Sequence, residues 1–461
     1  MAEWTNWAGD QSCRPAEVVH PRDRDELAAA IVRAAEAGRV ISVAGSGHSF
    51  TEAPMTEGTM IRVEALRGVI DADPDSGLVK VGGGTVLADL NEELAALGLA
   101  MENLGDIDRQ TIAGAISTAT HGTGARLPNL SAQVEAVEMV LADGSVRELW
   151  GEGAAPTGES AASAGTASGH GNAIQTGEAG ASENADLLRA ARVGVGALGA
   201  ISAVTLRCVP AFTLHRVDSR HPREEVLDSF EERAAAHEHF ELFTFPYADS
   251  ALVLERNRTD AAPRPRRRAA AWLNDTVLEN WALGALSATG RALPRAIPSL
   301  ARLAAALASG SRATDRSDRI FASERRVRFT EMEYGVPREN GPEAARRVIE
   351  WVRSNRYPVF FPIEMRVTAA DDAHLSPSHD RDTAYIAVHQ YKGMEWRPYF
   401  EAVESIMDEY GGRPHWGKRH FQTAATLASR YPAWADFQAA RDALDPNRTF
   451  TNEYASRILG P

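Results

Sequence analysis

Cysteine is almost absent from this sequence, which has two cysteines among 461 residues, Cys13 and Cys208. Two cysteines cannot build a disulfide framework or a thiolate metal cluster, and this scarcity is typical of a reducing cytosol. The N-terminal residues include acids and tryptophans where a signal peptide would be basic and then apolar. No apolar run approaches the length of a membrane span. We therefore expect a soluble, cytoplasmic protein with no integral membrane segment and no metal site.

Basic residues are also in the minority, since 49 lysines and arginines stand against 63 aspartates and glutamates. The formal net charge of −14 argues against a nucleic-acid partner, because nucleic acids bind basic surfaces. Hydrophobic residues make up 44% of the chain and charged residues 24%, as in an ordinary globular protein. A chain of 461 residues is too long for one small core, so we expect two domains.

The first third of the chain alternates between short helices and short strands. The apolar spacing predicts helices over residues 23–38 and 86–97, and strands over residues 40–43, 60–63, 69–71, 78–81, 134–141 and 145–149. These elements lack the regular strand–helix crossovers of a Rossmann unit, and no Gly-x-Gly-x-x-Gly motif follows a strand. We therefore predict an α+β fold.

A low-complexity segment interrupts this pattern at residues 151–184, which are almost entirely Gly, Ala, Ser, Thr, Glu and Asn. Such a segment cannot bury enough apolar surface to fold, so we predict a surface insertion. Order returns over residues 187–209, and the composition changes after Phe212. We place the boundary there, between domains of residues 1–212 and 213–461.

The second domain is predicted to combine further strands and helices with a C-terminal tail rich in polar and aromatic residues. Strands are expected over residues 241–245, 251–256, 325–334, 359–367 and 383–390, helices over residues 341–354 and 396–410, and a long helical region over residues 262–316.

Residues 43–50 read Val-Ala-Gly-Ser-Gly-His-Ser-Phe, an apolar run that breaks into a loop of small residues around His48. Small side chains let backbone N–H groups approach a bulky anionic ligand closely. A histidine fixed in such a loop presents a nucleophilic ring nitrogen to that ligand. A glycine-rich loop after a strand is also ordinary turn chemistry, so this segment alone leaves both interpretations open.

A second segment, residues 103–124, is dense in glycines and hydroxyl side chains and ends in Thr-His-Gly-Thr-Gly. Backbone N–H and side-chain O–H groups at this density suit contacts to phosphates and to a ribityl chain. Close helix packing on small residues is the alternative interpretation.

Three features in the second half of the chain carry side chains that could take part in catalysis. Period-2 alternation in Pro-Ile-Glu-Met-Arg places Glu364 and Arg366 side by side on one face of an apolar strand, where charges are costly unless they are used. His389 lies on another strand, and Arg-Pro-His-Trp-Gly-Lys forms a rigid aromatic turn that ends at Lys418. A structural ion pair and a satisfied core histidine remain the alternatives for the strand residues.

Four of these motifs, in this order and spacing, resemble those of the sugar-lactone oxidases of the vanillyl-alcohol-oxidase flavoprotein superfamily. They are the loop around His48, the segment of residues 111–124 that ends in Thr-His-Gly-Thr-Gly, Glu-Met-Arg at 364–366 and Arg-Pro-His-Trp-Gly-Lys at 413–418. The resemblance is nearest to the D-arabinono- and L-gulono-1,4-lactone oxidases or dehydrogenases, and it covers the chain apart from residues 151–184. It implies a two-lobed PCMH-type FAD-binding domain and an α+β substrate domain, or cap, with an antiparallel sheet over the isoalloxazine. It also implies that the segment ending at Lys418 returns to the flavin.

The resemblance further implies which residues bind FAD and which contact the substrate. Cofactor contacts are expected from Ala44, Gly45, Ser46, Gly47, His48, Ser49, Gly105, Asp106, Thr111, Gly114, Ser117, Thr118, Thr120, His121, Gly122, Gly124 and Ile201. His48 matches the histidine that is often joined to the flavin 8α-methyl group, whereas the cysteine that often forms a second tether has no counterpart. Glu364, Arg366, His389 and Lys418 match the substrate-contacting residues.

The expected reaction is hydride transfer from a ring CH–OH carbon of L-gulono-, L-galactono- or D-arabinono-1,4-lactone to flavin N5. Dioxygen or another redox acceptor would then reoxidise the flavin. Arg366 and Lys418 would stabilise developing negative charge, Glu364 would fix Arg366 and accept a substrate hydroxyl, and His389 would be a base or a hydroxyl partner. Alditol oxidase, acting on xylitol or sorbitol, is the alternative enzyme, although it has a serine where this chain has Asp106. A non-catalytic flavin-binding protein is the alternative from another class.

Overall fold

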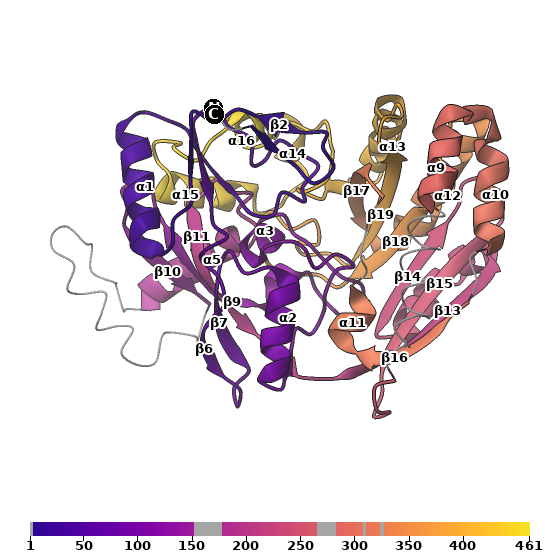
Figure 1. The fold of residues 1–461 in the computed structure, drawn as a ribbon, viewed down its shortest axis with the longest axis horizontal. Coiled ribbons are helices and arrows are strands. Elements are labelled where there is room, and N and C mark those ends of the chain that lie inside the picture. Colours follow the sequence, from indigo (N-terminus) through magenta and orange to yellow (C-terminus); the bar gives the residue numbers. More distant parts are fainter. Residues whose placement is uncertain (1–2, 152–177, 265–282, 308–309, 323–326) are drawn as a thin grey trace.

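The computed structural model describes residues 3–151, 178–264, 283–307, 310–322 and 327–461. The chain forms two bodies that lie side by side (Figure 1). The N-terminal body contains a three-stranded and a five-stranded sheet, and the C-terminal body, the cap, contains an eight-stranded sheet. Helices and antiparallel sheets occur together in this arrangement, so the α+β prediction is confirmed.

The three-stranded sheet of the N-terminal body is parallel. Its strands occur in the order β3 (Glu17–Val19), β5 (Thr59–Arg62) and β4 (Ile41–Ala44). Helix α1 (Arg24–Glu36) begins where the Asp23 side chain accepts a hydrogen bond from the N–H of Glu26, at 2.8 Å. Its apolar face, which includes Leu27 and Ile31, packs in one core with Ile41 and Ile61 of the sheet.

The five-stranded sheet is antiparallel, and its helices fill the larger core of the N-terminal body. The strands occur in the order β10 (Val146–Trp150), β9 (Val134–Val140), β11 (Ala200–Arg207), β7 (Leu78–Gly82) and β6 (Val69–Asp73). Helices α2 (Leu87–Ala96), α3 (Ile112–Ser117) and α5 (Glu178–Arg192) pack in the core with them. Two short pairings, β1 (Trp4–Thr5) with β2 (Ser12–Cys13) and β8 (Leu99–Ala100) with β12 (Val209–Pro210), complete the strands of this body.

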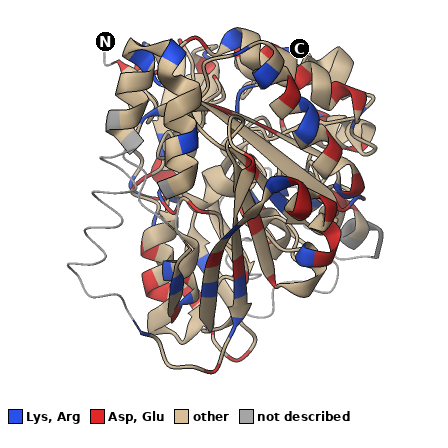
Figure 2. Cartoon of the chain, turned by 90° about the vertical axis from the view of Figure 1, so that its right-hand side faces the viewer, with Lys and Arg blue, Asp and Glu red and all other residues tan. Residues whose placement is uncertain are grey.

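The cap is built on one antiparallel sheet of eight strands. Their order is β16 (Arg312–Arg316), β13 (Thr213–Pro222), β15 (Ser250–Arg258), β14 (His239–Thr244), β18 (Ile363–Thr368), β19 (Thr383–Tyr391), β17 (Phe329–Pro337) and β20 (Arg413–Pro414). The associated helices are α6 (Arg223–Asp228), α7 (Phe230–Ala236), α9 (Leu283–Ala292), α10 (Ile297–Leu307), α11 (Ser317–Phe321), α12 (Gly341–Ser354) and α13 (Arg397–Glu409). Figure 2 shows basic and acidic residues interspersed over this side of the molecule.

The two faces of the cap sheet differ in chemistry, because successive side chains of a strand point to opposite faces. The apolar face, which includes Leu242, Met332, Met365 and Ile386, packs in one core with helices α12 and α13. The residues that alternate with these are charged or polar, and they are Glu241, Arg256, Glu331, Glu333, Glu364, Arg366, Tyr385 and His389. We call this second surface the polar face of the cap sheet.

The C-terminal residues return to the N-terminal body, as the yellow helices beside the indigo segments in Figure 1 show. Helix α14 (Ala424–Leu427) is followed by α15 (Trp434–Leu444) and α16 (Glu453–Leu459), which contribute Phe437 and Ile458 to the core of the five-stranded sheet. The backbone N–H of Ile41 donates to the carbonyl of Thr449 at 2.9 Å. The predicted polar tail is therefore an integral part of the first body.

Two predictions about local structure were wrong. Residues 178–184 were assigned to the low-complexity insertion but begin helix α5, where Ala185 and Leu188 are buried; residues 152–177 lie outside the described residues. Residues 312–316 were predicted to be helical but form strand β16. This strand pairs with β13 at the edge of the cap sheet, so tertiary pairing outweighs a local sequence with little strand character. Residues 265–282 of the same predicted helical region lie outside the described residues.

Candidate active site

A cleft with an empty volume of about 1060 Å³, part of it open to solvent, lies between the two sheets of the N-terminal body. Its walls come from the loop after β4, from helix α3, from the turn before β11 and from the C-terminal residues. Ten residues predicted to bind the cofactor line it: Gly45, Ser46, Gly47, His48, Ser49, Thr111, Gly114, Ser117, Thr118 and Ile201. The cleft therefore brings together the first and second glycine-rich segments, which are distant in sequence.

The loop of residues 45–49 is adapted to a ligand that approaches its backbone closely. A Cβ atom on Gly45 would lie 2.2 Å from Oγ1 of Thr111, so no other residue fits there without a shift. Gly47 has a φ of +72°, a conformation that favours glycine. Among the described residues, none accepts a hydrogen bond from the backbone N–H groups of residues 46–49. These donors suit the phosphates of a dinucleotide, so the residues of this loop fit the binding of FAD.

Sequence reasoning missed two parts of the cleft wall. The first is the turn of residues 194–199, Gly-Val-Gly-Ala-Leu-Gly, in which Val195 has a φ of +46° and Gly196 a φ of +79°. The three glycines of this turn could have indicated that it belongs to the cleft wall. The second part comprises Phe450 and Asn452. The amide of Asn452 donates to the carbonyl of Ala53 at 2.8 Å, a contact across 399 residues that no local pattern could predict.

The other seven predicted cofactor residues do not line this cleft: Ala44, Gly105, Asp106, Thr120, His121, Gly122 and Gly124. Ala44 ends strand β4, and the remaining six belong to the segment that runs from the cleft to the cap. The N–H of Gly124 donates to the carbonyl of Val367 at 2.7 Å. The second glycine-rich segment therefore also joins the two bodies.

A cluster of charges surrounds Arg366 on the polar face of the cap sheet. Its guanidinium donates to Glu241 at 3.0 and 3.2 Å, pairs with Glu364 and lies 3.3 Å from Asp106. Arg256 donates to the other oxygen of Glu241 at 2.9 Å. The predicted pairing of Glu364 with Arg366 is confirmed, whereas Glu241 and Arg256 were not anticipated.

The carboxyl groups of this cluster hold their protons with very different strengths. Burial acts to raise the pKa of Glu241, but Arg366 and Arg256 lower it to about 2. Burial raises the pKa of Glu364 well above its usual value, and Glu241 and Asp106 add to this effect against the opposing charge of Arg366. Glu364 therefore takes up a proton at a higher pH than Glu241 does, and its protonated form would offer both a donor and an acceptor.

A second cluster surrounds Glu331, which lies between Lys418 and His389. Lys418 forms an ion pair with Glu331, and its ammonium lies 5.3 Å from the centroid of the Phe50 ring. Burial acts to lower the pKa of Lys418, but Glu331 and Glu333 outweigh it, so the net shift is upward. Lys418 therefore keeps its charge in a buried site.

His389 has one bound and one unbound ring nitrogen. Its Nε2 lies 3.4 Å from Oε1 of Glu331, whereas Nδ1 is buried and has no hydrogen-bond partner among the described residues. The ring packs against Phe329 and Phe361, with centroid distances of 5.1 and 5.9 Å, and is only 8% exposed. Because Glu331 accepts the proton on Nε2, Nδ1 is the nitrogen with a free lone pair.

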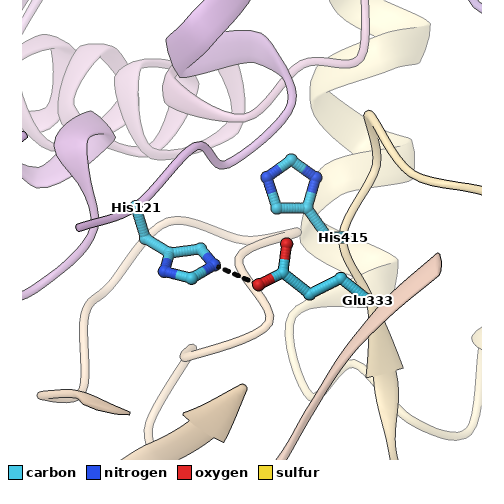
Figure 3. A group of neighbouring side chains, drawn as sticks. All are labelled: His121, Glu333 and His415. Atoms are coloured by element: carbon cyan, nitrogen blue, oxygen red, sulfur yellow. Dashed lines mark hydrogen bonds and ion pairs between the residues drawn. The ribbon is translucent and has the colours of Figure 1, made fainter. Parts of the chain in front are cut away.

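His121, Glu333 and His415 form a third buried group, shown in Figure 3. Their potential ligand atoms lie within 4.8 Å of one another. Nε2 of His121 lies 3.1 Å from Oε1 of Glu333, and Nδ1 of His415 accepts the N–H of Gly417 at 3.0 Å. Burial lowers the pKa of His415 to about 3, so this ring is neutral with its proton on Nε2. No lone pair of His415 is then free, and the group forms a hydrogen-bond network instead of a metal site.

His48 lies on the wall of the cleft, close enough to Lys418 for the charge of that residue to act on its ring. Burial lowers the pKa of His48 to about 4, and the positive charges of Arg328 and Lys418 contribute. Its imidazole is therefore neutral and nucleophilic at neutral pH. The ring stacks on Trp7 with a centroid distance of 5.5 Å.

All four residues predicted to be catalytic thus lie on or beside the polar face of the cap sheet. Sequence reasoning missed Glu331 and Glu333 there, although the Glu-Met-Glu of β17 repeats the alternation of the Glu-Met-Arg in β18. Both strands place two charged residues around a buried methionine. This shared pattern is the signal that could have found them.

Comparisons with known proteins agree with this geometry. A profile of the family described as D-arabinono-1,4-lactone oxidase matches residues 204–458, and a profile described as FAD binding domain matches residues 15–149. The chain is 47% identical over 458 residues to L-gulono-1,4-lactone dehydrogenase of Mycobacterium tuberculosis, covering 99% of each chain. It is 30% identical over 464 residues to L-gulonolactone oxidase of Mus musculus, covering 99% of this chain and 98% of the relative.

A solved structure of a solvent-stable cholesterol oxidase superposes with a TM-score of 0.80 at 18% identity. The match covers 100% of this chain and 97% of the other. At this identity the likeness concerns the fold alone. It confirms the predicted PCMH-type fold, with a two-lobed cofactor-binding body and a cap that carries an antiparallel sheet.

Proposed function

This chain belongs to the D-arabinono-1,4-lactone oxidase family, and from that membership we propose how its sites divide the reaction. It is an FAD-dependent oxidoreductase that oxidises a sugar-1,4-lactone. We propose L-gulono-, L-galactono- and D-arabinono-1,4-lactone as its substrates, bound between the cleft and the polar face of the cap sheet. The observation that carries this proposal is the pair of cations on the polar face of the cap sheet, the buried Arg366 and the partly buried Lys418.

The cleft holds FAD in this proposal. The free N–H groups of residues 46–49 and the hydroxyls of Thr111, Ser117 and Thr118 would bind the phosphates and the ribityl chain. Residues 105–106 and 120–124 would approach the isoalloxazine from the side of the cap. When bound, FAD supplies the hydride acceptor, and the protein binds and orients the lactone.

The residues of the polar face have separate tasks. Arg366 and Lys418 place fixed positive charge where the substrate oxygen gains negative charge. The raised pKa of Glu364 favours its protonated form, in which it donates to one substrate oxygen and accepts from a neighbouring hydroxyl. His389 receives the hydroxyl proton at Nδ1, because Glu331 holds the proton on Nε2.

The first prediction concerns substrate choice. In anaerobic solution, L-gulono-1,4-lactone is expected to bleach the flavin absorbance of the purified protein faster than xylitol does. Asp106 supports this order, because alditol oxidase has a serine where this chain has Asp106, whose carboxylate lies 3.3 Å from Arg366. Faster bleaching by xylitol or sorbitol would favour the alditol oxidase alternative. A yellow protein that no lactone or polyol bleaches would favour a non-catalytic flavoprotein.

The same experiment separates the electron acceptors. We propose that dioxygen or another redox acceptor takes the electrons from the reduced flavin. Admission of air after bleaching restores the yellow colour within seconds if dioxygen is the acceptor. Slow recovery in air and fast recovery with an added redox dye indicate a dehydrogenase.

The second prediction concerns the bond between His48 and the flavin, which we propose forms at the 8α-methyl group. The neutral imidazole on the wall of the cleft supports this proposal. Wild-type protein precipitated with acid should retain its flavin colour, whereas His48→Ala should release all of it into the supernatant. A His48→Ala protein that keeps acid-stable flavin would place the bond on another residue. A wild-type protein that releases all its flavin would show that no bond forms.

No helix among the described residues has the length and apolar composition needed to span a membrane. The cytoplasmic location that the scarcity of cysteine favours stays a prediction.

A further inference from the structure

The loop that carries His48 is held from outside by the N-terminal segment. The backbone N–H of Trp7 donates to the carbonyl of Gly47 at 2.8 Å. The side-chain amide of Asn6 donates to the carbonyl of Ser49 at 3.0 Å. A Cβ atom on Gly47 would meet the ring of Trp4 at 3.1 Å, so the segment also packs tightly against the loop. The two residues that flank His48 are therefore fixed to residues 4–7.

The Trp7 side chain also contacts the imidazole of His48 directly. Its ring and that of His48 are nearly parallel, with an interplanar angle of 22° and centroids 5.5 Å apart. Trp7 is held in turn by edge contacts to Phe50 and Phe329, at 6.4 and 5.5 Å, and by the Arg328 guanidinium at 4.5 Å from its ring centroid. The His48 ring thus lies against a wall that is anchored by both bodies of the protein.

Covalent attachment of the flavin makes a geometric demand on His48. A C–H bond of the 8α-methyl group and the imidazole N–H bond break, and a C–N bond forms. Two electrons and two protons pass to the flavin and then to the acceptor that reoxidises it in normal turnover. The reaction needs a neutral ring whose lone pair points at the methyl carbon, and it is slowed by free rotation of the ring.

We propose that Trp7 is a positioning residue for this attachment, and that it acts by holding the plane of the His48 ring. The proposal rests on the proposed bond between His48 and the flavin. Burial is the largest cause of the lowered pKa of the ring, and Trp7 shares in that burial, whereas Arg328 lowers the pKa through its charge. The effect of charge can therefore be tested separately, with a variant of Arg328.

The test measures covalent flavin in Trp7→Leu, Trp7→Phe and Arg328→Met. Each purified holoprotein is precipitated with acid, and the flavin in the pellet is compared with the total FAD per chain. Flavin fluorescence of the denatured band on a gel gives a second readout. Trp7→Leu is expected to lower the covalent fraction at least fivefold while total FAD binding stays close to wild type. Trp7→Phe keeps an aromatic wall and should retain most of the bond, and Arg328→Met should change it little.

Trp351→Leu is the matched control, because it removes a tryptophan of helix α12 that packs on Tyr357 and Tyr399, against the apolar core on the other face of the cap sheet. It should keep the wild-type covalent fraction. A Trp7→Leu protein that binds FAD and is fully covalent would overturn the proposal. Loss of the bond in Arg328→Met but not in Trp7→Leu would overturn it too, since charge would then control the reaction. Complete release of flavin from the wild type would remove the proposed bond itself, an outcome separate from a failure of Trp7.

Discussion

Lys418→Met is expected to leave FAD bound and to slow the reduction of the flavin by lactone by about 10²- to 10³-fold. The ammonium is paired with Glu331 in a largely enclosed site, and its pKa is raised, so it contributes a full positive charge where screening by water is reduced. Methionine keeps the length and the apolar stem over Phe50 but removes the charge. Anaerobic stopped-flow spectroscopy with L-gulono-1,4-lactone measures the rate.

Two companion variants separate this effect from a loss of structure. Lys392→Met removes the charge of an exposed lysine and should reduce its flavin at the wild-type rate. Lys418→Met with Glu331→Gln removes the pair together, so it should regain stability without regaining speed. An unchanged reduction rate in Lys418→Met would exclude Lys418 from the chemical step.

Arg366→Gln should have the second large effect, with losses of both activity and stability. The guanidinium neutralises two of the carboxyl groups that surround it, Glu241 and Asp106. Its removal leaves a buried excess of negative charge, which costs about 3 kcal/mol of the free energy of unfolding. Turnover should fall by roughly 10³-fold, because the fixed charge facing the substrate oxygen is lost.

The double variant Asp106→Asn with Arg366→Gln distinguishes the two losses. Removing the Asp106 charge restores neutrality around Glu241 and Arg256, so the melting temperature should recover by several degrees. The activity should not recover, because no cation has returned. Arg397→Gln, which breaks an exposed pair with Glu401, should change the free energy of unfolding by about 0.5 kcal/mol or less. Recovery of turnover in the double variant would show that Arg366 has only a structural role.

The sequence predicts those parts of the site that depend on local patterns of residues. Alternation in a strand is sufficient to place Glu364 and Arg366 on one face, and the structure pairs them. Small residues before and after His48 indicate a close-approach loop, and that loop lines the cleft. Both patterns depend only on neighbours a few residues away in the sequence, so they can be recognised without any knowledge of the fold.

The parts that sequence misses depend on contacts between distant segments. Glu241 becomes important only because β14 pairs with β18, which places it beside Arg366. Glu331 gains its role from Lys418, which lies 87 residues away. Strand β16 forms because β13 offers it a free edge, although its own residues are mostly charged. The alternation around Met332 could have indicated that Glu331 is a used charge, but no local pattern identifies the distant residue or strand that is paired in these three cases.

The return of the C-terminal residues to the first body sets an order of events during biosynthesis. Phe450 and Asn452 line the cleft, and Ile41 of the three-stranded sheet bonds to Thr449. On the ribosome, the cleft is therefore incomplete until residues 449–455 have emerged from the exit tunnel. The cap is synthesised earlier, because in the sequence its residues lie between the two segments that form the N-terminal body. If the cleft holds FAD as proposed, we expect cofactor capture to be a late event, and a chain truncated at residue 448 should be made without its flavin.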